Sequence, residues 1–562
     1  MWRRIQETIK ETSAEVLGKP KNTKKPWFNE RCEKALNQRK KFRNLYLNDP
    51  SHEENKTKYN ESRKEASRTF KYEKRVYTKN ILEEAEKYHN DSLTHIHKLL
   101  THIWEQEVLP EGWNVAVVCP IHKKGDPQIC NNYRGIALLN VVYKILSYCI
   151  LDRIKPIAEE ILGDYQGGFR PNRSTTDQIF SLRQIIEKSW EFNKSICILF
   201  VDFKKAYDSV HRHSLINILK EFKFPNKLIK LIEATLQNTE IKIKVASELS
   251  EPATVRTGLR QGDALSPILF NLILEKVIRA TNCNNGIVLG NSNINILAYA
   301  DDIAILGDTE ETIKQVCRKL ITMASKVGLE INDEKTEYMI VSRKDREYQQ
   351  GQSMNVEGHV FKRVTHFKYL GHLITQDNDL KMEVSSRIQK GSKSFFGLGK
   401  VLSSRTLSTN LKIQMYMTLI RPIVLYAAET WPLRKAEETR LKVFERRILR
   451  KIYGPCFDTN TSEWRKRHNK ELEELFQRPN IANEIKKRRL NWAGHAWQRV
   501  GSIVRTTIEE NPVGKRPLGR PRLRWVDCVK RDVENIEPEI PWRVVSENRD
   551  RWREICLAVW SQ

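Results

Sequence analysis

Three aspartates, Asp202, Asp301 and Asp302, lie at the ends of apolar runs that are expected to form strands. Asp301 and Asp302 lie between the apolar runs 294–297 and 303–306, which predicts a hairpin with two acids at its tip. Asp202 ends another apolar run, so strands lying side by side would bring the three acids together. Adjacent carboxylates resist burial unless a cation lies between them, and oxygen ligands suit Mg²⁺. Two such ions about 4 Å apart would support phosphoryl transfer, although an Asp pair is also a common way to begin a turn.

Several further motifs lie in a fixed order around these acids. They are Pro120–Asp126, Asn132–Ile136, Phe203–Asp208, Gly258–Pro267, Gly328–Asn332 with Lys335-Thr336, and Tyr369–Gly371. In this order and spacing the motifs resemble those of the reverse transcriptase of LINE-type (non-LTR) retrotransposons. The resemblance is strong over residues 104–371 and looser on both sides.

The resemblance implies an α+β, right-hand polymerase fold with fingers, a palm built on a mixed sheet, and a helical thumb. We expect a helical connector at 1–100, fingers and palm at 101–375, the thumb at 376–455 and a basic, Trp-containing segment at 456–562. Within 29–89 the charge pattern predicts two helices, broken at Asn48–Ser51. In the thumb, an apolar stripe at helical spacing is expected to face the core; it consists of Leu411, Met415, Leu419 and Ile423.

The family's metal ligands match this chain at positions that include the three acids. Asp202 and Asp301 are the expected primary ligands of two Mg²⁺ ions, for which Mn²⁺ is an alternative. Asp302 is the expected adjunct ligand, and the Phe203 carbonyl would complete the coordination, because Mg²⁺ prefers octahedral oxygen. Asp202, Asp301 and Asp302 are therefore the predicted catalytic residues.

Other matched positions are expected to hold the incoming nucleotide. Lys123, Lys124 and Arg134 would contact the triphosphate, with Arg134 favoured because its planar fork binds phosphate oxygens bidentately. Tyr207 matches the residue that excludes a ribose 2′-OH; otherwise it is a core aromatic. Gln261 and Gly262 match the turn that supports the template base and sugar.

Two further matches concern the leaving group and the primer. Lys335 is a candidate general acid for pyrophosphate, or an ordinary surface lysine. Tyr369, Leu370 and Gly371 resemble the primer grip, although a plain β-turn would have the same sequence.

The overall composition favours a polyanionic partner. The 562 residues include 97 Lys plus Arg against 70 Asp plus Glu, a formal net charge of +27, which favours nucleic acid over a membrane surface. The 10 cysteines form no Cys-x-x-Cys pair, which indicates a reducing intracellular compartment. No run reaches the ~18 apolar residues of a membrane span, and the N-terminus lacks the apolar core of a secretion signal.

Basic residues gather near the C-terminus. From residue 485 to 525 there are eleven Lys or Arg against two Glu, with three tryptophans interleaved (Trp492, Trp497 and Trp525). Such a segment can bind phosphates and unpaired bases, or the tryptophans can fill a small core. The predicted nucleic-acid contacts are Lys486, Lys487, Arg488, Arg489, Arg516, Arg520 and Arg522. The run Lys486–Arg489 is also a candidate nuclear import signal, so a nuclear or cytoplasmic ribonucleoprotein location is expected.

Two departures from the family bear on activity. Intact relatives place a Pro-Gly-containing fingers turn between the equivalents of Tyr88 and Leu93, and no such turn occurs here. No endonuclease-like segment precedes Trp27, so we expect a truncated element. The expected function is RNA-directed DNA polymerisation from dNTPs, with an RNA template and a DNA primer or target as partners. The alternatives are an RNA-binding relic that no longer polymerises and, less favoured, a role like that of a group II intron maturase.

Overall fold

The computed structural model describes residues 28–48, 53–281, 285–343, 351–459, 461–518 and 523–561. The chain divides into two compact units. The first contains residues up to Val118 together with Leu138–Ser147 and Lys230–Thr254, and the second contains the remainder. Helices and β-sheets of mixed direction occur throughout, so the fold is α+β, as predicted.

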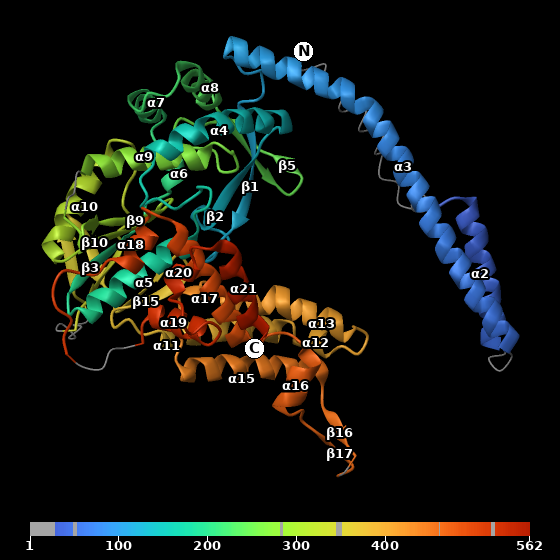
Figure 1. The fold of residues 1–562 in the computed structure, drawn as a ribbon. Helices are drawn as coiled ribbons and strands as arrows, with labels where there is room; N and C mark the ends of the chain where they lie inside the picture. The colour runs from blue at the N-terminus through green and yellow to red at the C-terminus, as the bar shows by residue number, and fades with distance from the viewer. Residues whose placement is uncertain are drawn as a thin grey trace. The chain divides into compact units, whose positions relative to one another are not determined.

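The first unit contains a long helical hairpin. Helices α2 (Glu30–Asn48) and α3 (Glu53–Gln106) pack along each other, as Figure 1 shows in blue. Aromatic pairs join them, among which the Tyr46 and Tyr59 rings stack with centroids 5.8 Å apart. Two helices are confirmed, although the predicted break between them falls largely outside the described residues. The α3 backbone stays helical across Tyr88–Leu93. This is the place where intact relatives have the fingers turn that the sequence lacks.

The strands of the first unit are few and short. β4 (Glu240–Val245) pairs in parallel with residues Val115–Val118 of β1 (Val115–His122). β4 also pairs antiparallel with β5 (Glu248–Leu249) and β6 (Ala253–Thr254). Two helices have part of their length in this unit, namely α4 (Val141–Ile161) and α8 (Asn226–Leu236).

The second unit is built on a six-stranded sheet of order β12-β13-β11-β3-β10-β9. The strands are β3 (Ile196–Val201), β9 (Ile296–Tyr299), β10 (Asp302–Gly307), β11 (Glu337–Val341), β12 (Ser353–Val356) and β13 (His359–Arg363). Every residue of β3 is buried. One face of the sheet packs on α5 (Thr175–Glu191), and α10 (Glu310–Ser325) contacts β3 and β10 while packing on α9 (Ser266–Thr281) (Figure 1). Because β3 is shielded on both faces, it forms a continuous apolar run instead of an alternating one.

Shorter elements of the second unit surround this sheet. They are η1 (Cys130–Asn132), β2 (Tyr133–Leu138), α6 (Ala206–Ser209), α7 (Arg212–Glu221), β7 (Ile287–Leu289), β8 (Ser292–Ile294), β14 (His366–Tyr369) and β15 (His372–Thr375). β14 and β15 form a separate antiparallel hairpin.

A helical bundle follows the sheet in sequence. It contains α11 (Lys381–Gly397), α12 (Gly399–Ser403), α13 (Thr409–Met415), the π turn η2 (Tyr416–Ile420), α14 (Arg421–Leu425), η3 (Ala428–Thr430) and α15 (Lys435–Tyr453). Two of the four residues in the predicted core stripe, Leu411 and Leu419, are exposed, whereas Ile413, Tyr416, Ile420 and Val424 are buried in the core.

The last hundred residues, which show no clear periodicity in the sequence, are mainly helical. They form β16 (Cys456–Asp458), β17 (Glu463–Arg465), α16 (Asn469–Phe476), α17 (Ile481–Gln498), α18 (Ile503–Glu509), α19 (Trp525–Glu534), α20 (Trp542–Val545) and α21 (Arg549–Ser561). Trp492, Trp497 and Trp525 are buried in one cluster with Phe180 of α5. The tryptophans therefore fill a core, in which this segment packs against α5 of the second unit. None of the helices in the described ranges combines the length and apolar composition that crossing a bilayer requires.

Candidate active site

The three predicted carboxylates lie at one edge of the six-stranded sheet. Val201 of β3 pairs with Ile303 of β10 in an antiparallel register. Asp202 directly follows Val201, and Asp302 directly precedes Ile303. The antiparallel register therefore brings Asp202 and Asp302 opposite each other. Asp302 also pairs with Tyr299 of β9, which leaves Ala300 and Asp301 as the turn of the predicted hairpin.

The electrostatics of these acids reflect their closeness. Burial raises the pKa of Asp302 to about 6, and the negative charges of Asp301 and Asp202 add to that rise. Burial also raises the pKa of Asp301, and the charge of Asp202 acts in the same direction. The positive charges of Arg134 and Lys335 oppose the rise at Asp301. The mutual repulsion of the three carboxylates favours binding of a cation, although Arg134 and Lys335 already neutralise part of their charge.

Asp202 is held by residues of the motif Gly328–Thr336. Its Oδ2 accepts hydrogen bonds from the Asn332 amide at 3.2 Å and from the Lys335 ammonium at 3.1 Å. Its backbone N–H donates to the Thr336 hydroxyl at 3.2 Å. Lys335 is thus a direct partner of a predicted metal ligand, and its side chain is 66% exposed, so this contact agrees with both interpretations given to it.

The hairpin turn is held by a residue that our sequence analysis did not identify. Ala300 has a φ of +55°, a left-handed conformation that costs a residue with a side chain about 1–2 kcal/mol. Gln166, only 1% exposed, supports this turn. Its Oε1 accepts from the N–H groups of Ala300 and Gly168, both at 2.8 Å, and its amide nitrogen donates to the Ala300 carbonyl at 3.4 Å. The neighbouring Gly167-Gly168 pair was the only sequence signal, since adjacent glycines permit close backbone approach.

Among the residues predicted to hold the nucleotide, Arg134 and Tyr207 lie near enough to Asp301 to interact with its charge. The carbonyl of Gln261 accepts from the Ala137 N–H at 2.8 Å, which joins the Gln261-Gly262 turn to β2. Gly262 has a φ of +118°, and a Cβ there would meet the Ala137 carbonyl oxygen at 2.7 Å, so glycine is required. Arg134, also on β2, is exposed and close enough to Asp301 to affect its pKa. Lys123 and Lys124 are exposed on the loop that follows β1.

Tyr207 satisfies parts of both interpretations given to it. Its ring stacks on Phe270 with centroids 4.6 Å apart, as a core aromatic would. Burial, followed by the charge of Asp301, raises the pKa of its phenol, so the ring also lies near the acids. Within the described residues its hydroxyl has no hydrogen-bond partner.

The predicted primer grip is a tight turn between β14 and β15. Leu370 and Gly371 both have positive φ, at +46° and +82°. The Tyr426 hydroxyl donates to the Leu370 carbonyl at 2.7 Å, and the Arg387 guanidinium donates to the Gly371 carbonyl at 2.5 Å. Tyr369 is buried with its ring near Phe200 of β3. Two residues of the helical bundle therefore fix the shape of this turn.

The donors at this edge suit a divalent cation. Three carboxylates supply only hard oxygen ligands, which Mg²⁺ prefers, although a metal ion would compete with the Lys335 ammonium for Asp202. Phe203, whose carbonyl was the predicted fourth ligand, is buried and forms a β-bridge with Ile331. Within the described ranges, no three His, Cys, Asp or Glu side chains are already arranged to hold a metal ion.

The predicted nucleic-acid contacts of the C-terminal segment require correction. Arg489 is fully buried, where its guanidinium bonds to Asp532 and to the Trp431 carbonyl, so it is not available to phosphate. Arg488 bonds to Glu484 and to the Leu425 carbonyl. Lys486 and Lys487 lie half-buried beside them on α17.

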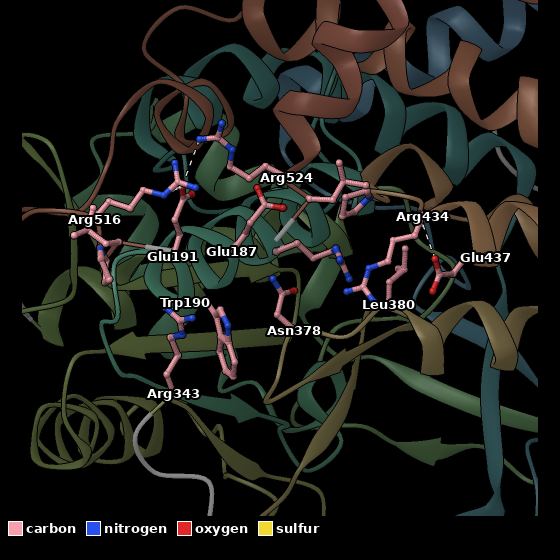
Figure 2. Close-up of a pocket in the computed structure, with 15 residues that line it drawn as sticks. Glu187, Trp190, Glu191, Arg343, Asn378, Leu380, Arg434, Glu437, Arg516 and Arg524 are labelled. Carbon is pink, nitrogen blue, oxygen red and sulfur yellow. Dashed lines mark hydrogen bonds and ion pairs between the residues drawn. The ribbon is translucent and has the colours of Figure 1, made fainter. Parts of the chain in front are cut away.

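The remaining contacts belong to the loop before α19. Arg516 forms an ion pair with Glu191 of α5, as Figure 2 shows, at a distance of 2.7 Å. Arg520 and Arg522 fall outside the described residues. The basic residues of this segment thus contribute, where described, mainly to its packing against the sheet domain.

Comparison with known proteins identifies the family of the central region. The family model described as reverse transcriptase (RNA-dependent DNA polymerase) matches residues 121–374, which include every acid of the candidate site. This chain contains a reverse transcriptase domain. Relatives of the domain come from non-LTR retrotransposons, as the motif order predicted.

Two relatives illustrate the extent of the similarity. The probable RNA-directed DNA polymerase from transposon BS of Drosophila melanogaster is 27% identical over 62% of this chain and 39% of its own length. The Pol polyprotein of the type-2 element R2DM, from the same organism, is 26% identical over 40% of this chain and 21% of its own length. The chain thus spans less than half the length of these two relatives. Among solved structures, apo telomerase from Candida tropicalis has a TM-score of 0.36 at 13% identity, over 75% of each chain.

Proposed function

We propose that this chain is an RNA-directed DNA polymerase of a non-LTR retrotransposon, which extends a DNA primer with dNTPs by copying an RNA template. One observation carries the proposal: the β3–β10 register aligns Asp202 with Asp302 and leaves Asp301 in the adjoining turn, inside the region that matches the reverse transcriptase model. Three carboxylates at one strand edge suit the binding of metal ions that serve phosphoryl transfer.

In this proposal the second unit has the parts of a right-hand polymerase. The six-stranded sheet with α5, α9 and α10 is the palm, and the bundle α11–α15 is the thumb. The segment containing Lys123 and Arg134 belongs to the fingers. The turn 369–371 connects the palm and the thumb. Thumb residues fix the shape of the turn, and its strands β14 and β15 follow the palm strands in sequence.

Each residue has a role consistent with its surroundings. Two divalent ions, Mg²⁺ or Mn²⁺, would activate the primer 3′-hydroxyl and stabilise the leaving oxygen, held by Asp202, Asp301 and Asp302. Arg134 would bind the triphosphate near Asp301. Lys335, which donates to Asp202, would give a proton to pyrophosphate as it departs.

Contacts with the sugar and the primer follow from the same geometry. The Tyr207 ring, held against Phe270, would occupy the space beside the sugar that a ribose 2′-OH requires. The carbonyls of the turn 369–371 are held by Tyr426 and Arg387, so the turn can present a fixed surface to the primer end.

A primer-extension assay tests the proposal. The purified chain, an RNA template, a DNA primer, dNTPs and Mg²⁺ should give extended product. Asp301→Asn should lower the rate by about 10³-fold, or about 4 kcal/mol of transition-state stabilisation, while RNA binding persists. Asp308→Asn is the matched control, because Asp301 directly precedes β10 and Asp308 is an exposed acid that directly follows it. Equal losses in both variants, or no extension by the unaltered chain, would contradict the proposal, and the latter result would favour the RNA-binding relic.

A further inference from the structure

A basic groove lies at the C-terminal end of α15, formed by residues outside the three-carboxylate site. The groove has a volume of about 500 Å³, and five of its lining residues are Arg or Lys: Arg447, Arg450, Lys451, Lys466 and Arg467. No acidic residue lines it. Such a concentration of positive charge attracts a polyanion.

Two of these arginines also fix the walls of the groove. The Arg450 guanidinium donates to the Arg467 carbonyl at 3.1 Å, and the Arg467 guanidinium donates to the Gly454 carbonyl at 3.2 Å. Arg447, Lys451 and Lys466 are exposed, and none of the three pairs with an acid in the described part of the chain. The groove is therefore preformed, and its charges are available to a ligand.

Aromatic rings accompany the charges. Phe396 lines the groove with 65% of its surface exposed, and the Arg447 guanidinium lies over its ring at 5.4 Å. The hairpin β16–β17 continues directly from both sides of the groove, since Pro455 precedes β16 and Lys466 follows β17. Figure 1 shows this hairpin projecting beyond α16.

The hairpin carries an exposed aromatic pair. Phe457 and Trp464 face each other across the two strands, with ring centroids 5.6 Å apart and an interplanar angle of 67°. A cross-strand pair of this kind stabilises a hairpin. It leaves Phe457 51% and Trp464 70% exposed, however, so ring surface remains for a partner.

Another arginine-rich pocket in the same unit shows the contrast. In the pocket of Figure 2, Arg516 and Arg524 both pair with Glu191, and two further glutamates, Glu187 and Glu437, line the same space. That pocket contains its own counter-charges and joins two parts of the protein. The groove at α15 has no such acids, which points to a ligand that supplies the negative charge.

We propose that the groove and the Phe457–Trp464 hairpin bind a single-stranded segment of RNA. Basic side chains would contact successive phosphates, and exposed rings would stack on unpaired bases, which are accessible in a single strand and not in a duplex. An acidic peptide would match the charge but would leave the rings unused. The choice of RNA rests on the proposed function, because the template is the single strand that such an enzyme must retain.

The test measures binding of a labelled single-stranded RNA to the full chain, by fluorescence anisotropy at several salt concentrations and without dNTPs. Lys451→Gln with Lys466→Gln should lower the slope of log K against log salt by about 1.4, because each phosphate that a protein neutralises on a single strand contributes about 0.7. The matched control is Lys319→Gln with Lys326→Gln, which removes two exposed lysines at and after the end of α10. An equal change in both double variants would overturn the proposal.

A second pair of variants examines the rings. Trp464→Leu should weaken binding about 10-fold, whereas Trp464→Phe, which keeps an aromatic ring and the cross-strand pair, should retain most of the affinity. Equal weakening by both would overturn the stacking role. Equal losses for an acidic peptide or for single-stranded DNA of the same sequence would overturn the assignment to RNA. Because binding is measured without dNTPs, the result is independent of whether the chain extends a primer.

Discussion

Replacing Gln166 with Met should disable the site without touching any carboxylate. Methionine keeps the length of the side chain but cannot accept the two hydrogen bonds that the Ala300 and Gly168 N–H groups donate to Oε1. Each buried N–H left without a partner costs about 1–3 kcal/mol. Because the freed turn can relax, we expect the lower part of that range for each group, or about 3 kcal/mol in the free energy of unfolding.

The effect on activity should exceed the effect on stability. Ala300 is held at a φ of +55°, and it will leave this conformation once Gln166 no longer compensates for its cost. Asp301 and Asp302 follow directly, and a displacement of ~1 Å at a reacting centre can cost ~10²-fold in rate. The kcat/KM of primer extension should therefore fall about 10²-fold, while urea unfolding shows a chain that is still folded.

Two further variants make the experiment decisive. Gln184→Met is the matched control, because Gln184 is another glutamine that is 1% exposed and lies on α5, and its Oε1 has no hydrogen-bond partner among the described residues. Ala300→Gly, added to Gln166→Met, should restore part of the activity, since glycine adopts a positive φ without strain. If Gln166→Met behaves like Gln184→Met in both assays, the proposed role of Gln166 is wrong.

Three other predictions follow from the structure. Tyr207→Val should lower the ratio of kcat/KM for dNTP over rNTP, because it opens the space beside the sugar, whereas Tyr207→Phe should keep the ratio; equal ratios in all three proteins would make Tyr207 a core residue only. Tyr426→Phe should raise the KM for primer, because it removes the hydrogen bond to the Leu370 carbonyl. The control is Tyr453→Phe, which removes a hydrogen bond to the Leu475 carbonyl and should leave the KM unchanged. Similar KM values in the two variants would refute the prediction. Burial raises the pKa of Glu187 to about 7, so the native state binds a proton that the unfolded state has released, and stability should fall as pH rises from about 5 to 8. In urea unfolding, Glu187→Gln should be more stable than the unaltered chain by about 1–2 kcal/mol at pH 8 and little different at pH 5. This figure allows for the partial exposure of the carboxyl. An equal difference in stability at both pH values would contradict the prediction.

The apolar pattern of the sequence was sufficient to predict the strands beside the three acids. β3 is a short, unbroken apolar run because both of its faces are shielded, and the β9–β10 hairpin is indicated by a polar pair between two such runs. Placing these strands side by side then predicted that Asp202, Asp301 and Asp302 lie at one edge of the sheet, which agrees with the β3–β10 and β9–β10 registers. Local pattern determines strand ends, and strand ends determine where the carboxylates lie.

The sequence could not show which apolar face of the thumb segment 411–424 is buried in the core. Leu411 and Leu419 alternate with Ile413 and Ile420 along the same segment, so two apolar faces compete for the core. The π turn η2 interrupts the segment at Tyr416–Ile420 and changes which face is buried. Periodicity indicates a helix here, but it cannot distinguish the buried face when both are apolar.

Charge was similarly ambiguous in the C-terminal segment. Arg489 belongs to a basic run, yet its carboxylate partner is Asp532, 43 residues further along the chain. A charge buried in such a pair requires hydrogen bonds to its remaining donors, and the Trp431 carbonyl accepts one of them. Composition counts charges without showing which are already neutralised by distant residues.

The support of the acid hairpin comes from a loop that carries no catalytic group. Gln166 is 134 residues from Ala300 in sequence, and it reaches the turn only because Gly168 lies against the Ala300 backbone, where a Cβ would approach the nitrogen to 2.2 Å. Arg170 anchors the loop by donating to the Gly163 carbonyl at 2.7 Å and to the Gln166 carbonyl at 3.1 Å. A two-residue turn with a strained alanine cannot hold two repelling carboxylates in place by itself. The placement of Asp301 and Asp302 therefore depends on the loop 163–170 as much as on their own strands, and substitutions in that loop should be read as changes to the active site.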